Sequence, residues 1–282
     1  MCNFRPNGLG WQRDLPDVRD WTPQHAVVRN MLATLDGEEA VPDRIDWCDY
    51  FGGINDQLGL KSSAAHACLG LMGYFERRAH GTMPTPSRMF VYKASRRLLH
   101  QRGDTGANLR TTWKAIVRFG APPEDVWPYD AARMDEEPDA FTYAFARDLE
   151  TLSYIRLDPR GQPGHETLRT MKSFLAAGFP CVFGFSVSTS LTKEPDIPSP
   201  TIFDTLLGGQ AVVAIGYNDN RRVHAHKGGL LIRNSWGPQW GDQGYGWLPY
   251  VYVEKGFASD FWTVLKPSWL ASGEFGRPIM NE

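Results

Sequence analysis

Residues 232–250 read IRNSWGPQWGDQGYGWLPY and form the most distinctive pattern in this chain of 282 residues. They connect two segments, 228–235 (GGLLIRNS) and 244–253 (GYGWLPYVYV), that are rich in aliphatic and aromatic residues. Glycine, asparagine, aspartate and proline bound both segments, which is the pattern of short β-strands joined by turns. We therefore expect a strand on each side of the Asn-Ser-Trp-Gly run.

The rest of the second half also indicates strands, whereas the first half indicates helices. Further strands are predicted at 179–188 (FPCVFGFSVS) and 210–218 (QAVVAIGYN). Helices are predicted near 25–35, from Ser62 or Ser63 onward, at 86–99 and at 108–120. The change from helices to strands falls between about residues 130 and 155, and this division is typical of an α+β fold.

The helix that starts at Ser62 or Ser63 is predicted to be buried. Apolar residues recur on one face at helical spacing, and most other residues of the first two turns are small. Serine is a favoured residue at a helix N-terminus, because its oxygen can accept from the free N–H groups of the first turn. The stripe consists of Ala64, Cys68, Leu71, Met72 and Phe75.

Composition and cysteine spacing exclude several classes of protein. The formal net charge of −2 provides no attraction for nucleic acid or anionic membranes. The longest apolar stretches are shorter than the ~20 residues of a membrane helix, and the N-terminus has no signal-peptide core. We therefore expect a cytoplasmic protein. Cys2, Cys48, Cys68 and Cys181 are too widely spaced for a zinc site or a disulfide scaffold, so they are expected to be free thiols.

Several segments together resemble the papain-like cysteine peptidases. Residues 234–237 (NSWG), followed by Trp-Gly and Gly-Tyr pairs, resemble the asparagine segment of that family. The stretches 120–130 (GAPPEDVWPYD) and 211–217 (AVVAIGY) occur in the family's order, and the likeness extends over most of residues 8–255. Segments 8–21 and 86–96 look like the bacterial branch that lacks a prodomain.

The resemblance implies a papain-like fold with two lobes and a cleft between them. The helix-rich lobe is expected to span residues 46–140 and the β-barrel-like lobe residues 141–270. Residues 1–45 are interpreted as an extension that packs on the body, and residues 271–282 as a C-terminal tail.

The resemblance also implies a role for four positions, two of which depart from the family pattern. Gln57 matches the oxyanion-hole glutamine, and the nucleophile lies six residues later, where this chain has Ser63. Ser62 is the alternative if the match slips by one residue. The histidine position holds Gln210, while Asn234 matches the asparagine. Other residues expected in the cleft are Lys61, Ser62, Ala64, Gly209, Trp236 and Trp240.

These residues lack an evident proton shuttle. A serine nucleophile needs a base, and the amide of Gln210 only donates and accepts hydrogen bonds. We therefore expect Ser63 to cap the helix and line a ligand site. Asn234 should then bond Gln210 or the backbone, shielded by Trp236, and residue 210 should face residue 63 within hydrogen-bonding reach.

Four other side chains are candidate substitutes for the missing base or candidate metal ligands. His66 is three residues after Ser63, but we interpret it as a core histidine with one satisfied nitrogen. Lys61 could act as in Ser-Lys enzymes, although a solvated position at the cleft rim is preferred. His224 and His226 form an H-x-H pattern, which we interpret as an exposed turn rather than a metal site.

Taken together, the sequence favours a papain-fold pseudopeptidase that binds a peptide, a protein partner or a small acyl ligand in the cleft. The alternatives are an acyl-transfer or cyclisation enzyme that uses Ser63 with Gln57, and a peptidase inactivated by a Cys-to-Ser substitution. No cofactor, metal, nucleic acid or membrane is expected as a partner. The sequence does not indicate an oligomeric state.

Overall fold

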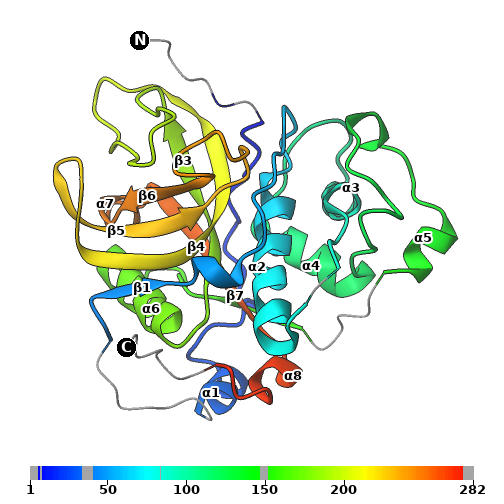
Figure 1. Ribbon diagram of the computed structural model, residues 1–282, viewed down its shortest axis with the longest axis horizontal. Helices are drawn as coiled ribbons and strands as arrows, with labels where there is room; N and C mark the ends of the chain where they lie inside the picture. Colours follow the sequence, from blue (N-terminus) through cyan, green and yellow to red (C-terminus); the bar gives the residue numbers. More distant parts are fainter. Residues whose placement is uncertain (1–5, 7, 34–40, 83, 147–151, 276–282) are drawn as a thin grey trace.

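The computed structural model describes residues 6, 8–33, 41–82, 84–146 and 152–275. It has the expected α+β architecture, with a helical lobe beside an antiparallel sheet (Figure 1). The helices are α1 (Ala26–Ala33), α2 (Ser63–His80), α3 (Arg88–Leu98), α4 (Leu109–Phe119), α5 (Ala140–Ala144), α6 (Gly164–Ala176), α7 (Val251–Glu254) and α8 (Pro267–Leu270), with 3₁₀ turns η1 (Cys48–Tyr50) and η2 (Ala131–Arg133). The strands are β1 (Arg44–Asp46), β2 (Ser153–Arg156), β3 (Cys181–Ser188), β4 (Leu206–Val223), β5 (His226–Arg233), β6 (Tyr245–Pro249) and β7 (Ala258–Leu265).

Helix α2 is the central element of the helical lobe and is buried along its length, as predicted. The whole predicted stripe is buried, with Ala64, Cys68, Leu71 and Phe75 fully inaccessible. Helices α3 and α4 pack on one side of α2 and strand β4 on another. The helix ends at Gly81, whose φ of +81° suits a glycine C-cap, and the Gly81 N–H donates to the Arg77 carbonyl. This burial holds the N-terminus of α2 against the sheet.

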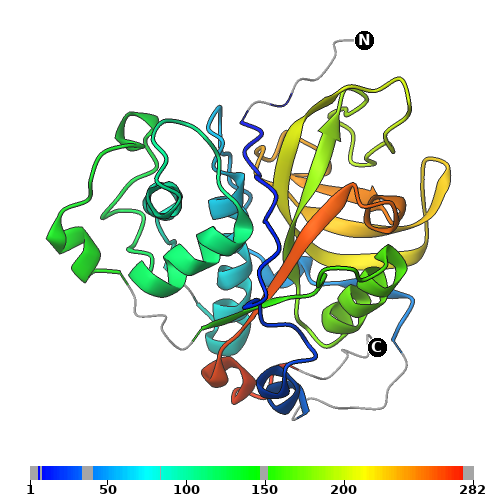
Figure 2. The same ribbon diagram turned by 180° about the vertical axis from the view of Figure 1, so that it is seen from behind.

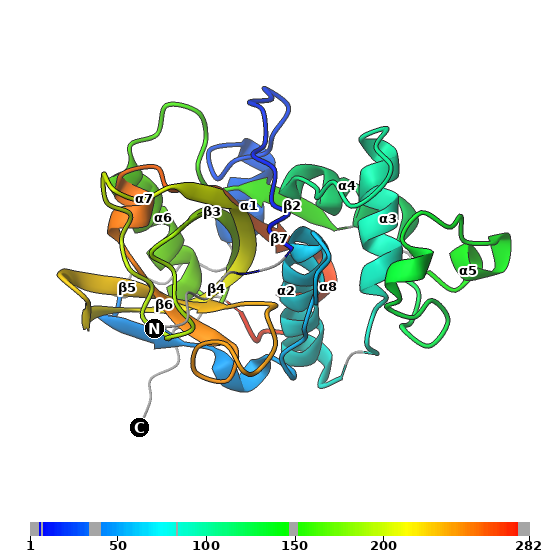
Figure 3. The same cartoon turned by 90° about the horizontal axis from the view of Figure 1, so that it is seen from above.

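The sheet is antiparallel and follows the order β2-β7-β3-β4-β5-β6, with β1 also paired to β4. Strand β4 is its longest strand and pairs with β3 and β5, which places Gln210 opposite Phe185. The predicted strands at 179–188, 210–218 and 228–235 are confirmed with small shifts of boundary. Figure 3, viewed from above, shows the sheet curving beside α2.

One predicted strand is wrong in its second half. Strand β6 stops at Pro249, and Val251–Glu254 form the short helix α7 instead of continuing the strand. Proline has no N–H to donate to a neighbouring strand, so the ladder ends there. Val251, Tyr252 and Val253 are buried, as expected for aliphatic and aromatic side chains, but they lie in a helical turn.

The N-terminal segment lies between the two lobes, where it is hydrogen-bonded to both. The Trp11 N–H donates to the Gly209 carbonyl on β4 (3.0 Å), and the Ala107 N–H donates to the Gly10 carbonyl (3.0 Å). The Gln12 N–H returns a bond to the Ala107 carbonyl (3.2 Å). Figure 2 shows this dark-blue segment running down the junction of the lobes. The division of the chain into an extension, two lobes and a tail stays a prediction, and residues 1–5, 7, 34–40 and the tail after residue 275 lie outside the described residues.

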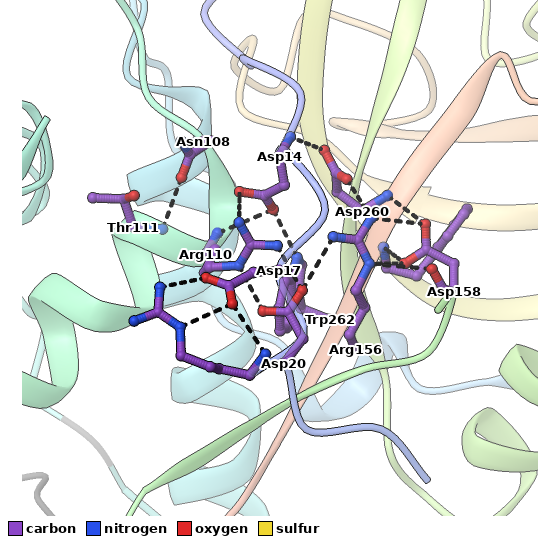
Figure 4. Close-up of polar contacts among 12 residues, drawn as sticks. Asp14, Asp17, Asp20, Asn108, Arg110, Thr111, Arg156, Asp158, Asp260 and Trp262 are labelled. Atoms are coloured by element: carbon purple, nitrogen blue, oxygen red, sulfur yellow. Dashed lines mark hydrogen bonds and ion pairs between the residues drawn. The ribbon is translucent and has the colours of Figure 1, made fainter. Parts of the chain in front are cut away.

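Further along, the same segment is fastened by a buried cluster of carboxylates and arginines (Figure 4). The Asp14 N–H donates to Asp260 of β7 (2.7 Å), and Asp14 accepts from the indole N–H of Trp262 (3.0 Å). Arg110 of α4 forms a two-pronged ion pair with Asp20 (2.7 and 2.6 Å). The segment is thereby tied to a helix of one lobe and a strand of the other.

Asp14 is an acidic group in an unfavourable place for a charge. Burial and the nearby charge of Asp260 raise the pKa of the Asp14 carboxyl to about 7, although Arg110 and Arg156 oppose the rise. Burial also raises the pKa of Asp260 and that of Asp158, the latter to about 6. The folded chain therefore holds protons that the unfolded chain releases above its ordinary aspartate pKa of ~4.

We expect Asp14→Asn to reduce the pH dependence of stability. With a raised folded-state pKa, the contribution of Asp14 is fully present below about pH 4 and is lost as pH rises through about 7. The wild-type free energy of unfolding should fall by up to about 1.4 kcal/mol per pH unit for one such proton. Urea unfolding across this range should show a shallower slope for Asp14→Asn, because the amide mimics the protonated acid.

The exposed Asp49 provides the matched control, since Asp49→Asn should keep the wild-type slope. Equal slopes for Asp14→Asn and the wild type would show that Asp14 does not hold the proton.

None of the described helices is both long enough and apolar enough to cross a membrane.

Candidate active site

The structure brings together the side chains of Gln57, Ser63, Gln210 and Asn234. Gln57 lies in the loop before α2, and Ser63 is the first residue of that helix. Gln210 lies on β4, and Asn234 directly follows β5. The first three residues are fully inaccessible and Asn234 is 2% exposed, so the arrangement is a buried polar cluster in the contact between α2 and the sheet.

The amide nitrogen of Gln210 is at the centre of this cluster. Its Nε2 lies 2.9 Å from Gln57 Oε1, 2.9 Å from Asn234 Oδ1 and 3.3 Å from Ser235 Oγ. An NH₂ group carries two protons, so three oxygens share them. The Ser235 hydroxyl in turn donates to Gln57 Oε1 (2.6 Å). The network therefore links the loop before α2 to the end of β5 through neutral groups only.

Asn234 is bonded as predicted. Its Oδ1 accepts from the Gln210 amide and from the N–H of Ser235 (2.8 Å). Two atoms of the cluster have no hydrogen-bonding partner among the described residues, namely Gln210 Oε1 and Asn234 Nδ2. One buried acceptor and one buried donor thus remain available at the centre of the site.

Ser63 does not cap the helix, contrary to the prediction. It is the first helical residue, and its hydroxyl oxygen accepts from the Ala211 N–H at 3.3 Å. Ser62 flanks the helix but also makes no side-chain cap, because its hydroxyl bonds to the Tyr129 hydroxyl (2.6 Å). Both hydroxyls therefore bond to groups that are distant in sequence and not to the first turn of the helix. Residues 63 and 210 were expected to lie within hydrogen-bonding reach. The Ser63 side chain instead bonds the backbone N–H of Ala211, the residue after Gln210, and the side chains of Ser63 and Gln210 are not bonded to each other.

The amide of Gln57, expected to serve an oxyanion hole, is already fully used. Its Nε2 donates to the carbonyl oxygens of Gly8 (2.7 Å) and Leu60 (2.8 Å). Two protons and two acceptors leave no free N–H at this position. The N-terminal segment therefore places a carbonyl oxygen on the very group that would stabilise an oxyanion.

None of the alternative bases contacts Ser63. His66 is buried, its Nδ1 lies near the Ser62 carbonyl (3.1 Å) and hydroxyl (3.3 Å), and its Nε2 has no partner. Burial lowers the pKa of His66 to about 3, and the charge of Arg88 adds to this. The imidazole is thus a core group and a weak base, in agreement with its interpretation as a core histidine.

The other polar candidates lie at the surface. Lys61 is exposed, as preferred, and its backbone N–H donates to Asp104 (2.9 Å). His224 is exposed in the turn that joins β4 to β5, with His226 beginning β5, as the sequence indicated. No group of three potential metal ligands occurs in the part of the chain that the structure describes.

Trp11 fills the space beside Gln210 and was not predicted as part of the site. A Cβ added to Gly184 on β3 would lie 1.9 Å from the Trp11 ring, and one added to Gly209 would lie 2.4 Å from it. Only glycine at both positions leaves room for the indole. Gly8 and Gly10 similarly allow the segment to approach the backbone at Leu60 and Lys61. The sequence signal for this role is the pair of glycines, Gly8 and Gly10, that flank Leu9 and precede Trp11.

The remaining residues expected in the cleft occupy different environments. Gly209 contacts Trp11, whereas Ala64 is buried within α2. Trp236 and Trp240 pack edge to face, with ring centroids 5.2 Å apart. Trp240 is itself buried, so it contributes to the core beside the cluster rather than to a ligand surface.

We expect Asn234→Ala to destabilise the fold by about 1 to 3 kcal/mol, because it leaves the buried Gln210 amide and the Ser235 N–H short of an acceptor. Chemical denaturation measures the loss directly. The exposed Asn220 is a suitable control, since Asn220→Ala should stay within about 0.5 kcal/mol of the wild type. A wild-type melting profile for Asn234→Ala would contradict this structural role.

Known proteins resemble this chain over most of its length. Residues 41–259 match the family described as papain family cysteine protease. An uncharacterized peptidase C1-like protein of Acanthamoeba polyphaga mimivirus is 33% identical over 218 residues, which cover 74% of this chain and 68% of the viral protein. A cathepsin B-like protein of Giardia intestinalis is 25% identical over 226 residues, covering 78% of this chain and 72% of that protein.

Solved structures of a cysteine protease and a procathepsin also superpose on this chain. Xylellain, a cysteine protease from Xylella fastidiosa, superposes with a TM-score of 0.75 and 30% identity over 92% of this chain and 96% of its own. Procathepsin B S9 of Trypanosoma congolense superposes with a TM-score of 0.61 over 91% of this chain and 85% of its own, at 17% identity, which is a likeness of fold alone.

Proposed function

Because this chain belongs to the papain family of cysteine proteases, we propose that it is a member without peptidase activity whose lobes hold an extended peptide strand between them. The observation that carries the proposal is the amide of Gln210, which bonds three oxygens where peptide hydrolysis would need a group that takes up a proton.

The chemistry of the cluster supports the absence of hydrolysis. In a cysteine peptidase of this kind, the reactive thiolate is stabilised by a nearby imidazolium. Here the nucleophile position holds the hydroxyl of Ser63, which accepts a backbone hydrogen bond, and the neighbouring side chains are amides. A hydroxyl without a base is not a useful nucleophile near neutral pH.

The hydrogen bonds of the N-terminal segment support the binding of an extended strand. Residues 10–12 exchange backbone bonds with Ala107 of the helical lobe and Gly209 of β4. Backbone bonds of this kind give affinity for a strand whatever its side chains, while a pocket for an alternate side chain gives selectivity. The space beside Gly184, which holds Trp11, would supply that selectivity for an aromatic residue.

The segment of this chain is the occupant in the structure, and we propose that a peptide or an extended segment of a partner protein takes its place. We place this binding in the cytoplasm and assign the chain to the bacterial branch of the family. The likeness to xylellain over 92% of the chain supports that branch. Acyl transfer by Ser63 is the weaker candidate, because Gly8 and Leu60 already use the Gln57 amide.

The wild-type protein should not hydrolyse casein or dipeptidyl substrates. Turnover that persists in clean preparations and disappears in Ser63→Ala would overturn the proposal.

Restoring the ion pair tests the assignment of the two positions. Ser63→Cys together with Gln210→His should give a thiol whose pKa is lower than the ~8.5 of free cysteine, because the helix N-terminus and an imidazolium both stabilise a thiolate. The readout is the rate of iodoacetamide modification at about pH 6 relative to Ser63→Cys alone, with Trp11→Ala added to both variants to open the site. Cys68 and Cys181 should add little to this rate, since burial raises the pKa of both thiols, and Gln210→His alone reports the background from the other native thiols. Equal rates in the two variants would show that residues 63 and 210 do not meet.

Binding of a strand is tested with a fluorescent peptide that copies residues 6–14. The variant Trp11→Ala should bind it more tightly than the wild type, because the intramolecular segment then competes less well for the space beside Gly184. Fluorescence anisotropy measures the affinity. Gln12→Ala is the control, since that side chain bonds only the exposed Thr105 carbonyl and should leave binding unchanged. Failure of the Trp11→Ala protein to bind the peptide would contradict the proposal.

A further inference from the structure

A second polar site lies farther along α2, away from the amide cluster. A pocket of about 330 Å³ is bounded by the later turns of α2 and by the segments 52–55 and 84–86. Three arginines, Arg77, Arg88 and Arg233, line it, and none of its described lining residues is an aspartate or a glutamate. The pocket is therefore positively charged.

Arg233 is the most deeply buried of the three, at 5% exposed. Its Nη2 donates to the Gly53 carbonyl (2.6 Å), while its Nε–H is buried without an acceptor. No carboxylate lies within ion-pair distance of Arg233 in the described ranges. A guanidinium stays charged in proteins, and a buried charge is costly unless an opposite charge accompanies it. The described residues supply no such charge to Arg233.

The other two arginines, Arg77 and Arg88, also contribute positive charge to the pocket. Arg77 donates through Nε to the Tyr50 carbonyl (2.9 Å) and likewise has no carboxylate partner among the described residues. Only Arg88 is neutralised, by Glu124 at 3.2 Å. Burial lowers the pKa of Arg233, Tyr245 opposes this shift, and the charges of Arg77 and Arg88 lower the pKa further, so the three cations repel one another.

Glycines keep the guanidinium groups close to the backbone of α2. A Cβ added to Gly70 would lie 2.9 Å from Arg233 Nη1, and one added to Gly73 would lie 3.2 Å from Arg77 Nη2. Gly52, on the facing segment, would place a Cβ 3.1 Å from Arg77 Nη1. These glycines therefore leave room beside the cavity for the guanidinium groups of Arg77 and Arg233, neither of which has a carboxylate partner among the described residues.

We propose that this pocket binds a phosphate group, either as inorganic phosphate or as a small phosphate monoester, between Arg77 and Arg233. A phosphate carries nearly two negative charges and matches the planar donor fork of arginine. The volume is at the lower end of the range for ligand pockets, which suits a small molecule. Arg233 directly precedes Asn234, and α2 begins at Ser63, so the bound anion joins the two elements that carry the amide cluster.

Calorimetric titration of the full chain with inorganic phosphate, at fixed ionic strength and near neutral pH, tests the site. The wild type should bind saturably, and Arg77→Gln should bind at least about tenfold more weakly, because one charged fork is lost. Arg169→Gln removes an exposed arginine of α6 and should bind like the wild type. Arg77 is only partly buried and lies outside the amide cluster, and circular dichroism verifies that the variant is folded.

Three additional anions complete the experiment. Glycerol phosphate that binds at least as tightly as inorganic phosphate identifies a monoester as the ligand, and weaker binding identifies the free ion. Chloride or acetate that binds as tightly as phosphate would overturn the proposal, as would unchanged phosphate affinity in Arg77→Gln. Phosphate should also raise the melting temperature of the wild type and Arg169→Gln but not that of Arg77→Gln.

Discussion

The amide of Gln210 is the contact on which the geometry of the site depends. It joins the oxygen atoms of Gln57, from the helical lobe, to those of Asn234 and Ser235, from the end of β5. All of these groups are buried, so each bond that is lost would leave a polar atom unpaired in a place that water does not reach. This contact therefore holds the lobes together.

The N-terminal segment completes that contact. Its Gly8 carbonyl uses a proton of Gln57, and its Trp11 ring lies against Gly184 and Gly209. Farther along, Asp14 and Asp20 connect it to β7 and α4 through buried charges. The strand therefore has both a polar anchor and an apolar one. A competing strand must supply equivalents of the backbone bonds and of the indole, which is why we expect aromatic extended peptides as ligands.

Buried charges are paired with opposite charges in one part of the molecule and not in another. Behind the N-terminal segment, arginines and carboxylates lie together, so each buried charge has a partner, and the excess of acids is reduced by raised pKa values. Beside α2, Arg77 and Arg233 have no acidic partner in the described part of the chain. The cluster of arginines and carboxylates fastens the N-terminal segment to both lobes. The arginines beside α2 instead leave a positive charge that a ligand can neutralise.

Much of the fold could be predicted from the sequence, because its signals are local. The apolar stripe of α2, the strand at 210–218 and the order of the segments that resemble the family indicated an α+β papain-like fold. The same resemblance led us to expect Gln57, Ser63, Gln210 and Asn234 near one another. The same local logic failed at 251–254, where Pro249 ended a strand that the side chains favoured. The replacement of a Cys-His pair by Ser63 and Gln210 stays a prediction, because it rests on the resemblance of the sequence to the family.

Only the tertiary structure decided how those groups are used. Serine near a helix start predicts a cap, but Ser62 and Ser63 bond instead to Tyr129 and the Ala211 N–H, which are distant in sequence. The role of Trp11 depends on glycines more than 170 residues away, at 184 and 209, and the unpaired charge of Arg233 depends on which side chains are absent around it. The sequence by itself determined the fold and the chemical groups available. Their hydrogen-bonding partners and uncompensated charges are properties of long-range packing, which no local pattern encodes.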